Sequence, residues 1–151
     1  MNFKIERALD QIGVKILHEL QMNARISFSE IGRRVGLSSP AVAERVKKME
    51  EIGIICGYNV NVDNEKIGFP ILAFIFLKTQ SEKYNKVYTL AENTPEIVEC
   101  HCISGSESFI IKVLSNSVSR LDYLVEKLSE FGATKTSIVL SSPIKKVAID
   151  I

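Results

Sequence analysis

The chain has 151 residues, of which 46% are hydrophobic and 25% are charged, and its net charge at pH 7 is +1. This balance is ordinary for a globular protein and excludes an intrinsically disordered chain. No apolar run reaches the length of a membrane span, and the first ten residues lack the apolar core of a signal peptide, so we expect a cytoplasmic protein.

Charge is divided weakly along the chain. Residues 1–60 contain nine basic and seven acidic side chains, for a net charge of +2, whereas residues 61–151 contain ten and eleven, for a net charge of −1. A chain this close to neutral binds phosphates weakly as a single copy. If the partner is DNA, binding therefore depends on local basic clusters and on more than one copy of the chain.

The first predicted helix runs from about Asp10, its N-cap, to Gln21, because apolar residues recur there at helical spacing. A second, short helix begins at a capping box, Ser27-Phe28-Ser29-Glu30, and ends at Gly36. The first helix is expected to serve as a scaffold for the helices after it.

The third predicted helix has Ser39 as its hydroxyl N-cap and Pro40 at the first helical position. Val42, Val46 and Met49 form one apolar stripe, so one face docks and the opposite face is displayed. Gly53 comes next as a left-handed C-cap. Two short helices joined by a tight turn that contains glycine indicate a helix-turn-helix, whose second helix enters a DNA major groove.

Beyond this helix the pattern changes. Alternating apolar residues from Ile55 to Val62 predict a hairpin arm or linker strand, and residues 61–69 gather the turn formers of a hinge. From residue 70 the predicted order is strand, helix, strand, strand, helix, strand, the βαββαβ order of a ferredoxin-like α+β domain. The six elements are Ile71–Thr79, Glu82–Asn93, Ile97–Ile103, Ser108–Leu114, Ser117–Phe131 and Thr134–Ser141.

These strands are apolar on both faces, most clearly over Ile71–Leu77. Two helices cover only one face of such a sheet, and the other would expose more apolar surface than a monomer usually tolerates. We expect two sheets to pack face to face in a homodimer, unless the arm or the C-terminal segment covers the open face. The tail Ile144–Ile151 alternates in polarity and is predicted to add an edge strand.

Three segments together resemble the Lrp/AsnC (leucine-responsive, or feast/famine) family of transcription regulators: LDQIGVKILHELQMNARIS, GLSSPAVAERVKKMEEIGIICGY and VNVDNEKIG. The resemblance implies a winged helix-turn-helix domain at residues 1–60, a linker at 61–69, and a ferredoxin-like (RAM/ACT-like) effector-binding and oligomerisation domain at 70–151. It also implies dimers that assemble further, to octamers. Gly13 and Gly32 depart from the family pattern, which has an acidic residue and alanine there, and each costs its helix up to about 1 kcal/mol.

The predicted function is a sequence-specific regulator of transcription that binds double-stranded DNA, with two reading helices addressing half-sites about one helical turn apart. The residues expected at bases or sugars are Ser38, Ser39, Pro40, Ala43, Glu44 and Lys47. Those expected at phosphates are Arg33, Arg34, Arg45 and Lys48. Arg45 borders the apolar stripe, so a structural role is the alternative for it.

The resemblance also places an amino-acid effector site at the loop Gly105, Ser106, Glu107 and Ser108. A glycine lets the backbone approach a ligand closely, backbone N–H groups hold a carboxylate, and an acid pairs with an ammonium group. The family has an acidic residue where this chain has Ser108, so the ammonium contact falls to Glu107 or to a carbonyl. From the residues alone, the loop also suits a plain polar hairpin turn.

Catalytic, cofactor and metal sites are not expected. The odd number of cysteines predicts no disulfide framework. Cys100 and Cys102 point to one face of a strand and His101 to the other, so the three cannot converge on one ion. Three alternatives remain open: a DNA-wrapping architectural protein, a sensor that no longer binds DNA, and an enzyme like the sirohaem decarboxylases that resemble this family.

Overall fold

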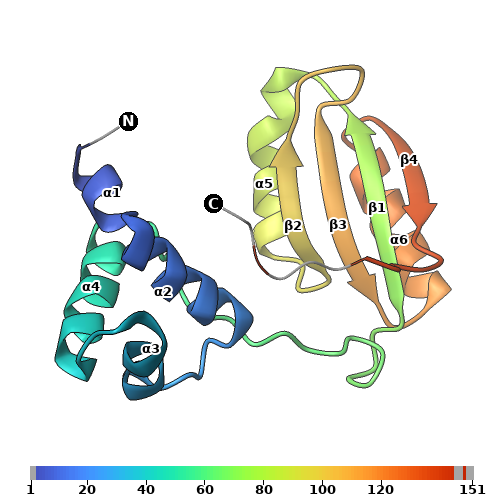
Figure 1. The fold of residues 1–151 in the computed structure, drawn as a ribbon. Coiled ribbons are helices and arrows are strands. Elements are labelled where there is room, and N and C mark those ends of the chain that lie inside the picture. The colour runs from blue at the N-terminus through green and yellow to red at the C-terminus, as the bar shows by residue number, and fades with distance from the viewer. Residues whose placement is uncertain (1–2, 145–147, 149–151) are drawn as a thin grey trace. The chain divides into compact units, whose positions relative to one another are not determined.

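The structure is a computed structural model that describes residues 3–144 and residue 148. It divides into two compact units, one that includes the chain up to Val60 and one from Asn61 to Pro143. Figure 1 shows helices alone in the first unit and a sheet with helices in the second. None of the helices in the described part of the chain is long and apolar enough to cross a membrane.

Four helices build the described part of the first unit, and capping residues set the ends of the last three. They are α1 (Phe3–Ala8), α2 (Gln11–Met22), α3 (Phe28–Val35) and α4 (Ser39–Glu51). The Gly13 N–H donates to the Asp10 carboxylate at 2.7 Å and the Glu30 N–H donates to Ser27 Oγ at 3.2 Å, which confirms both predicted N-caps. Helix α1 was not predicted.

The turn between α3 and α4 differs from the prediction in one detail. Gly36 takes φ +74°, a left-handed conformation that ends α3 without a steric penalty. The N-cap of α4 is Ser38, whose Oγ accepts from the Ala41 N–H at 3.4 Å, so the prediction of Ser39 as the cap is wrong by one residue. Ser39 instead opens the helix and Pro40 occupies its second position, where its missing N–H is still without cost.

The apolar stripe of α4 lies in the core of the first unit. Val42, Val46 and Met49 are at most 1% exposed. The two valines pack with Ile16 and Leu20 of α2, and Met49 packs in a second cluster with Ala8 and Leu17. Gly53 has φ +76°, and the Ile54 N–H donates back to the Met49 carbonyl at 2.8 Å, which closes the helix as predicted.

No strand forms between Ile52 and Pro70, so the predicted arm or linker strand from Ile55 to Val62 is not observed. A strand needs a second backbone to receive its hydrogen bonds. Within the described chain, this segment meets none. It leads into a turn, in which the Lys66 N–H donates to the Asp63 carboxylate at 3.3 Å.

The second unit has the predicted βαββαβ order. Its elements are β1 (Ile71–Lys78), η1 (Ser81–Lys83), α5 (Tyr84–Glu92), β2 (Ile97–Cys102), β3 (Phe109–Ser115), α6 (Val118–Ser129) and β4 (Ala133–Ile138). The antiparallel sheet has the strand order β2-β3-β1-β4, which is the ferredoxin-like arrangement.

Helices α5 and α6 lie against one face of this sheet (Figure 1). Inward residues of β1 and β3, such as Ile75 and Phe109, are completely buried there with Val87 of α5 and Leu128 of α6. The opposite face carries a row of half-buried apolar side chains: Leu72, Phe74, Phe76, Ile110 and Leu114. We call this row the open apolar face. The predicted edge strand in the tail falls mostly outside the described residues.

Candidate nucleic-acid interface

One side of α4 is exposed on the surface of the first unit. Because the buried stripe occupies one side of this helix, Pro40, Glu44, Lys47 and Lys48 remain exposed on the rest, while Ala43 is half-buried. Ser38 and Ser39 place hydroxyls at the N-terminal end. A helix held by one face, with small and polar residues at its free end, fits the depth of a major groove.

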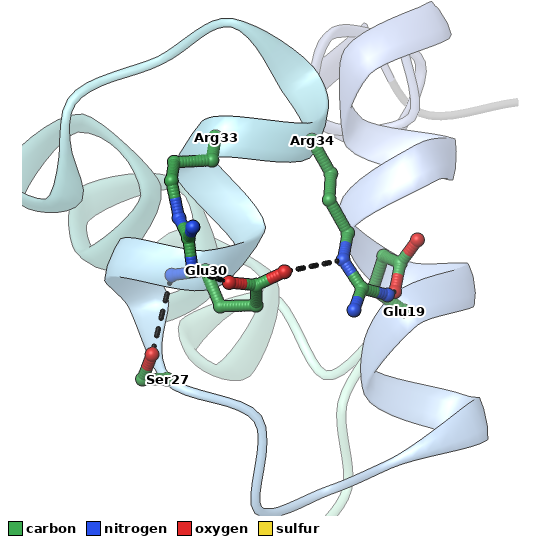
Figure 2. Close-up of polar contacts among 5 residues, drawn as sticks. All are labelled: Glu19, Ser27, Glu30, Arg33 and Arg34. Carbon is green, nitrogen blue, oxygen red and sulfur yellow. Dashed lines mark hydrogen bonds and ion pairs between the residues drawn. The ribbon is translucent and has the colours of Figure 1, made fainter.

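Arg34, at the end of α3, joins two helices. Its guanidinium donates to Glu30 Oε1 at 2.9 Å within α3 and to Glu19 Oε2 of α2 at 2.5 Å. Figure 2 shows Glu30 between the two arginines, with Arg33 also paired to its carboxylate. The predicted capping box is therefore half formed: Ser27 caps the helix, but Glu30 turns to the arginines instead.

Arg45 also has a structural partner. Its two terminal nitrogens donate to the two oxygens of Asp10 at 2.8 and 3.0 Å, a bidentate pair that joins α4 to the N-cap of α2. The arginine is one-third exposed. Of its two predicted roles, the structure therefore supports the one of holding the reading helix in place.

The other basic side chains are freer. Lys47 is 75% exposed and lies 3.7 Å from Glu51, a contact too long and too solvated to restrain it strongly. Lys48 is exposed, and the described residues offer it no hydrogen-bond or ion-pair partner. Arg33 pairs with Glu30 but is 79% exposed, and Glu30 keeps Arg34 as a second partner if Arg33 moves. These three can turn toward phosphates at small cost.

One basic residue beside α4 was not predicted from the sequence. Arg7 of α1 lines a polar recess of about 240 Å³ together with Asp10, Glu44, Arg45 and Lys48. The residue lies in a six-residue helix before the first strong helical pattern. The sequence of this helix, FKIERA, mixes apolar and charged residues, which is a weak helical signal. The position of Arg7 beside α4 depends on how α1 and α4 cross, which the sequence does not show.

The Asp10–Arg45 pair predicts a pH dependence. The hydrogen bond that Asp10 accepts from Arg45 lowers the pKa of this aspartate most, and the hydrogen bond from the Gly13 N–H lowers it further. A lowered pKa in the folded state stabilises the fold above the unfolded-state value near 3.9 and loses this effect as the pH falls below it. Asp10→Asn keeps a good N-cap but removes the charge. We expect a loss of about 0.2–1 kcal/mol at pH 7, measured by thermal unfolding, that fades as the pH falls from about 4 and is gone once the pH is below the lowered pKa of Asp10.

Asp122→Asn is the control, because this exposed aspartate on α6 has no ion-pair partner among the described residues. Its unfolding curve should match the parent at both pH values. A pH-independent difference for Asp10→Asn would remove the charge of the pair as the cause.

The predicted effector loop connects β2 to β3. Gly105 has φ +138°, a conformation that favours glycine, and the Ser106 hydroxyl donates to the Glu107 carboxylate. Ser108 is 8% exposed: its hydroxyl donates to the Thr79 carbonyl at 2.8 Å and accepts from the Thr79 N–H at 3.1 Å. Ser108 thus fixes the loop to the end of β1, and Glu107 is the member with an available charge.

A metal site with three or more protein ligands is not found in the described residues. No group of three or more histidine, cysteine, aspartate or glutamate side chains converges there. His101 pairs with Glu99 at 3.1 Å, and Lys112 donates to the same carboxylate at 2.6 Å; the hydrogen bond to Lys112 and then that to His101 lower the pKa of Glu99.

Comparisons with known proteins agree with this geometry. The model of the AsnC-type helix-turn-helix domain matches residues 9–50, and that of the Lrp/AsnC ligand binding domain matches residues 72–149. YezC of Bacillus subtilis, an uncharacterized HTH-type transcriptional regulator, is 38% identical over 134 residues, which cover 89% of this chain and 95% of YezC.

Two solved structures extend the likeness. LrpC of Bacillus subtilis superposes with a TM-score of 0.86 at 31% identity, covering 91% of this chain and 99% of LrpC. The regulator NMB0573 of Neisseria meningitidis, solved as a complex with L-methionine, has a TM-score of 0.86 at 24% identity, covering 93% of this chain and 96% of NMB0573, and supports the fold alone. The chain therefore belongs to the Lrp/AsnC family and is a helix-turn-helix transcriptional regulator with a ligand-binding domain.

Proposed function

We propose that this regulator acts in the cytoplasm and binds double-stranded DNA with α4 in the major groove. The observation that supports this most is the division of α4 into a face buried to 1% exposure or less and a polar face that the first unit leaves free. The proposed base and sugar contacts are Ser38, Ser39, Pro40, Ala43, Glu44 and Lys47. The proposed phosphate contacts are Arg33, Lys48 and Arg7.

Arg34 and Arg45 take a different part in this proposal. Moving Arg34 to a phosphate would leave Glu19 without its ion-pair partner, and moving Arg45 would do the same to Asp10. We assign them to holding α3 and α4 against α2. Residues 1–60, 61–69 and 70–151 are the proposed DNA-binding, linker and effector-binding divisions.

Lys47→Ala tests the DNA contact directly. A lysine at a phosphate or base edge releases counterions on binding, so its loss should weaken binding to all sequences and lower the slope of log affinity against log salt by about one unit per reading helix. Fluorescence anisotropy with labelled DNA at several salt concentrations measures both quantities.

Lys86→Ala, an exposed lysine of α5 in the other unit, is the matched control and should leave the slope unchanged. An unchanged slope in Lys47→Ala would remove this lysine from the interface. The same assay with random competitor DNA separates a sequence-specific regulator from an architectural protein, because only the former discriminates at fixed salt.

The proposal includes a homodimer formed through the open apolar face, with further assembly to octamers. Half-buried phenylalanines and leucines on an otherwise finished sheet are the pattern of an interface between sheets. A dimer also supplies the second reading helix that a chain of net charge +1 needs.

We propose an amino acid as effector, held at the loop of Gly105, Ser106 and Glu107. Glu107 would pair with the ammonium group, and the backbone around Gly105 would approach the carboxylate. Support comes from the match to a ligand-binding domain and from the L-methionine complex of the Neisseria protein. Ser108 would position the loop through Thr79.

A thermal-shift screen against the twenty amino acids tests this site. At about a hundredfold excess over the dissociation constant, a bound effector stabilises the fold by about 2.7 kcal/mol. We expect that one or more amino acids raise the melting temperature and that Glu107→Gln removes the shift, whereas Glu126→Gln on the exposed side of α6 retains it. A shift that survives in Glu107→Gln would place the ammonium contact elsewhere.

Catalysis is not part of this proposal, because the relatives are transcriptional regulators. A sirohaem-decarboxylase activity would be accompanied by haem-type absorbance of the purified protein in the presence of its substrate, which provides a direct check.

A further inference from the structure

Two thiols share one side of the edge strand β2. Cys100 is half-buried and packs against the core cluster between the sheet and its helices, and Cys102 is exposed. In the sheet, Cys100 lies opposite Ile111 and Cys102 lies opposite Phe109, and both of these β3 residues are buried beneath the helices, which places the two thiols on the helix-covered side. Neither cysteine is in a disulfide bond within the described residues.

The residue between them is on the other side. His101 pairs with Glu99, and Glu99 accepts from Lys112, so this polar group faces away from the thiols. The cysteines are two residues apart in a strand, and their Cα atoms are therefore separated by roughly 6.7 Å. Their sulfur atoms can lean toward one another without any change of backbone.

We propose that Cys100 and Cys102 form a dithiolate site for one two-coordinate thiophilic metal ion of the Cu(I) class. Thiolates select soft ions such as Cu(I). Metal–sulfur bonds of roughly 2.3 Å span at most about 4.6 Å between two sulfur atoms, which side chains with this Cα separation can reach. Binding displaces one proton from each thiol and gives a bis-thiolate complex, without oxidation or reduction of either partner.

The coordination number selects the ion. Zn(II) in proteins takes three or four protein ligands, and the described residues offer no third histidine, cysteine or carboxylate beside these thiols. A linear two-coordinate ion requires only the pair. The orientation of His101 toward the opposite face, which rules out a site made of both cysteines and the histidine, therefore does not rule out a site made of the two cysteines alone.

A disulfide is the competing use of the pair. Disulfides usually join Cα atoms 4.4–6.8 Å apart, so roughly 6.7 Å lies at the upper limit and the bond would require a strained strand. A metal ion bridges a longer sulfur–sulfur distance than a disulfide and avoids this strain. The open apolar face is on the other side of the sheet, so the dimer proposed above leaves the thiols accessible.

The test is a titration of the reduced full-length chain with Cu(I), under argon, in competition with the coloured chelator bicinchoninate. We expect one Cu(I) per chain and a loss of this binding in both Cys100→Ala and Cys102→Ala. Cys56→Ala is the matched control, because Cys56 is an exposed thiol in the other unit and donates only to the Gly53 carbonyl. It should bind as the parent does.

Phenylarsine oxide gives a second readout that does not depend on metal affinity. Two adjacent thiols and the oxide form a cyclic dithioarsenite and release one water, which intact mass spectrometry detects as one adduct per chain. Cys102 is exposed, so Cys102→Ala leaves the core in place even if Cys100→Ala unfolds, as circular dichroism will report.

Retention of Cu(I) or of the arsenical adduct in Cys102→Ala would overturn the proposal, as would an equal loss in Cys56→Ala. Zn(II) binding of the same stoichiometry that competes as effectively as Cu(I) would overturn the two-coordinate assignment.

Discussion

Gly13→Ala is expected to destabilise the DNA-binding unit, although alanine is the better helix former. A Cβ atom on Gly13 would lie 1.9 Å from the Ala8 carbonyl oxygen and 3.2 Å from the Met49 methyl carbon. Alanine gains about 1 kcal/mol in helix propensity, but overpacking costs about 1–3 kcal/mol, and an overlap with backbone belongs at the upper end. We expect a net loss of about 1–2 kcal/mol in thermal unfolding monitored by circular dichroism.

The control is His18→Ala, an exposed position on the same helix. Because no neighbour crowds this side chain, the substitution should change only the intrinsic helix propensity, and the variant should be as stable as the parent or slightly more stable. If Gly13→Ala were also stabilised, α1 would not approach α2 as closely as the structure has it.

Close contacts with backbone explain why this chain has glycine at positions 13 and 32, where the family pattern has other residues. A Cβ on Gly32 would lie 2.4 Å from the Leu37 carbonyl oxygen, in the turn that leads to α4. The sequence alone reveals only the cost of glycine in a helix. The benefit of glycine is that it leaves room for the backbone carbonyl group that lies against the helix at each position, and no local sequence pattern predicts that contact.

Periodicity predicted most of the fold because it depends on neighbours along the chain. β1 was expected to end at Thr79 and ends at Lys78, and the hydrophobic face of α4 is the one predicted. The cap moved from Ser39 to Ser38 because both residues carry a hydroxyl and either can precede Pro40 in the first turn. Local chemistry does not distinguish them.

The candidate interface was predictable as a surface but not as a set of contacts. Polar positions on α4 can be deduced from its apolar stripe. The tie between Arg45 and Asp10, by contrast, spans 35 residues and depends on the crossing of α4 and α2. Equally, Ser108 was a polar loop residue in the sequence, and only the pairing of β3 with β1 brings it to Thr79.

Phe74→Glu should break the homodimer, because it places a charge at the centre of the open apolar face. Phe74 lies on the central strand β1, opposite Lys112 on β3 and Ser137 on β4. In a face-to-face dimer the two copies of this residue lie between sheets about 10 Å apart, where a carboxylate has little water, and the ammonium group of Lys112 is already bound to Glu99. We expect a shift from dimer to monomer in light scattering and a loss of DNA affinity at equal chain concentration.

The fold itself should survive, because this face lies outside the core of Ala73, Ile75 and Leu77. Val118→Glu serves as the matched control: it adds the same charge at an apolar position that is 66% exposed, at the start of α6, where an acidic residue suits the helix dipole. This variant should remain dimeric. If Phe74→Glu also remained dimeric with an unchanged circular dichroism spectrum, the interface would lie elsewhere, and the pairing of two reading helices would need another route.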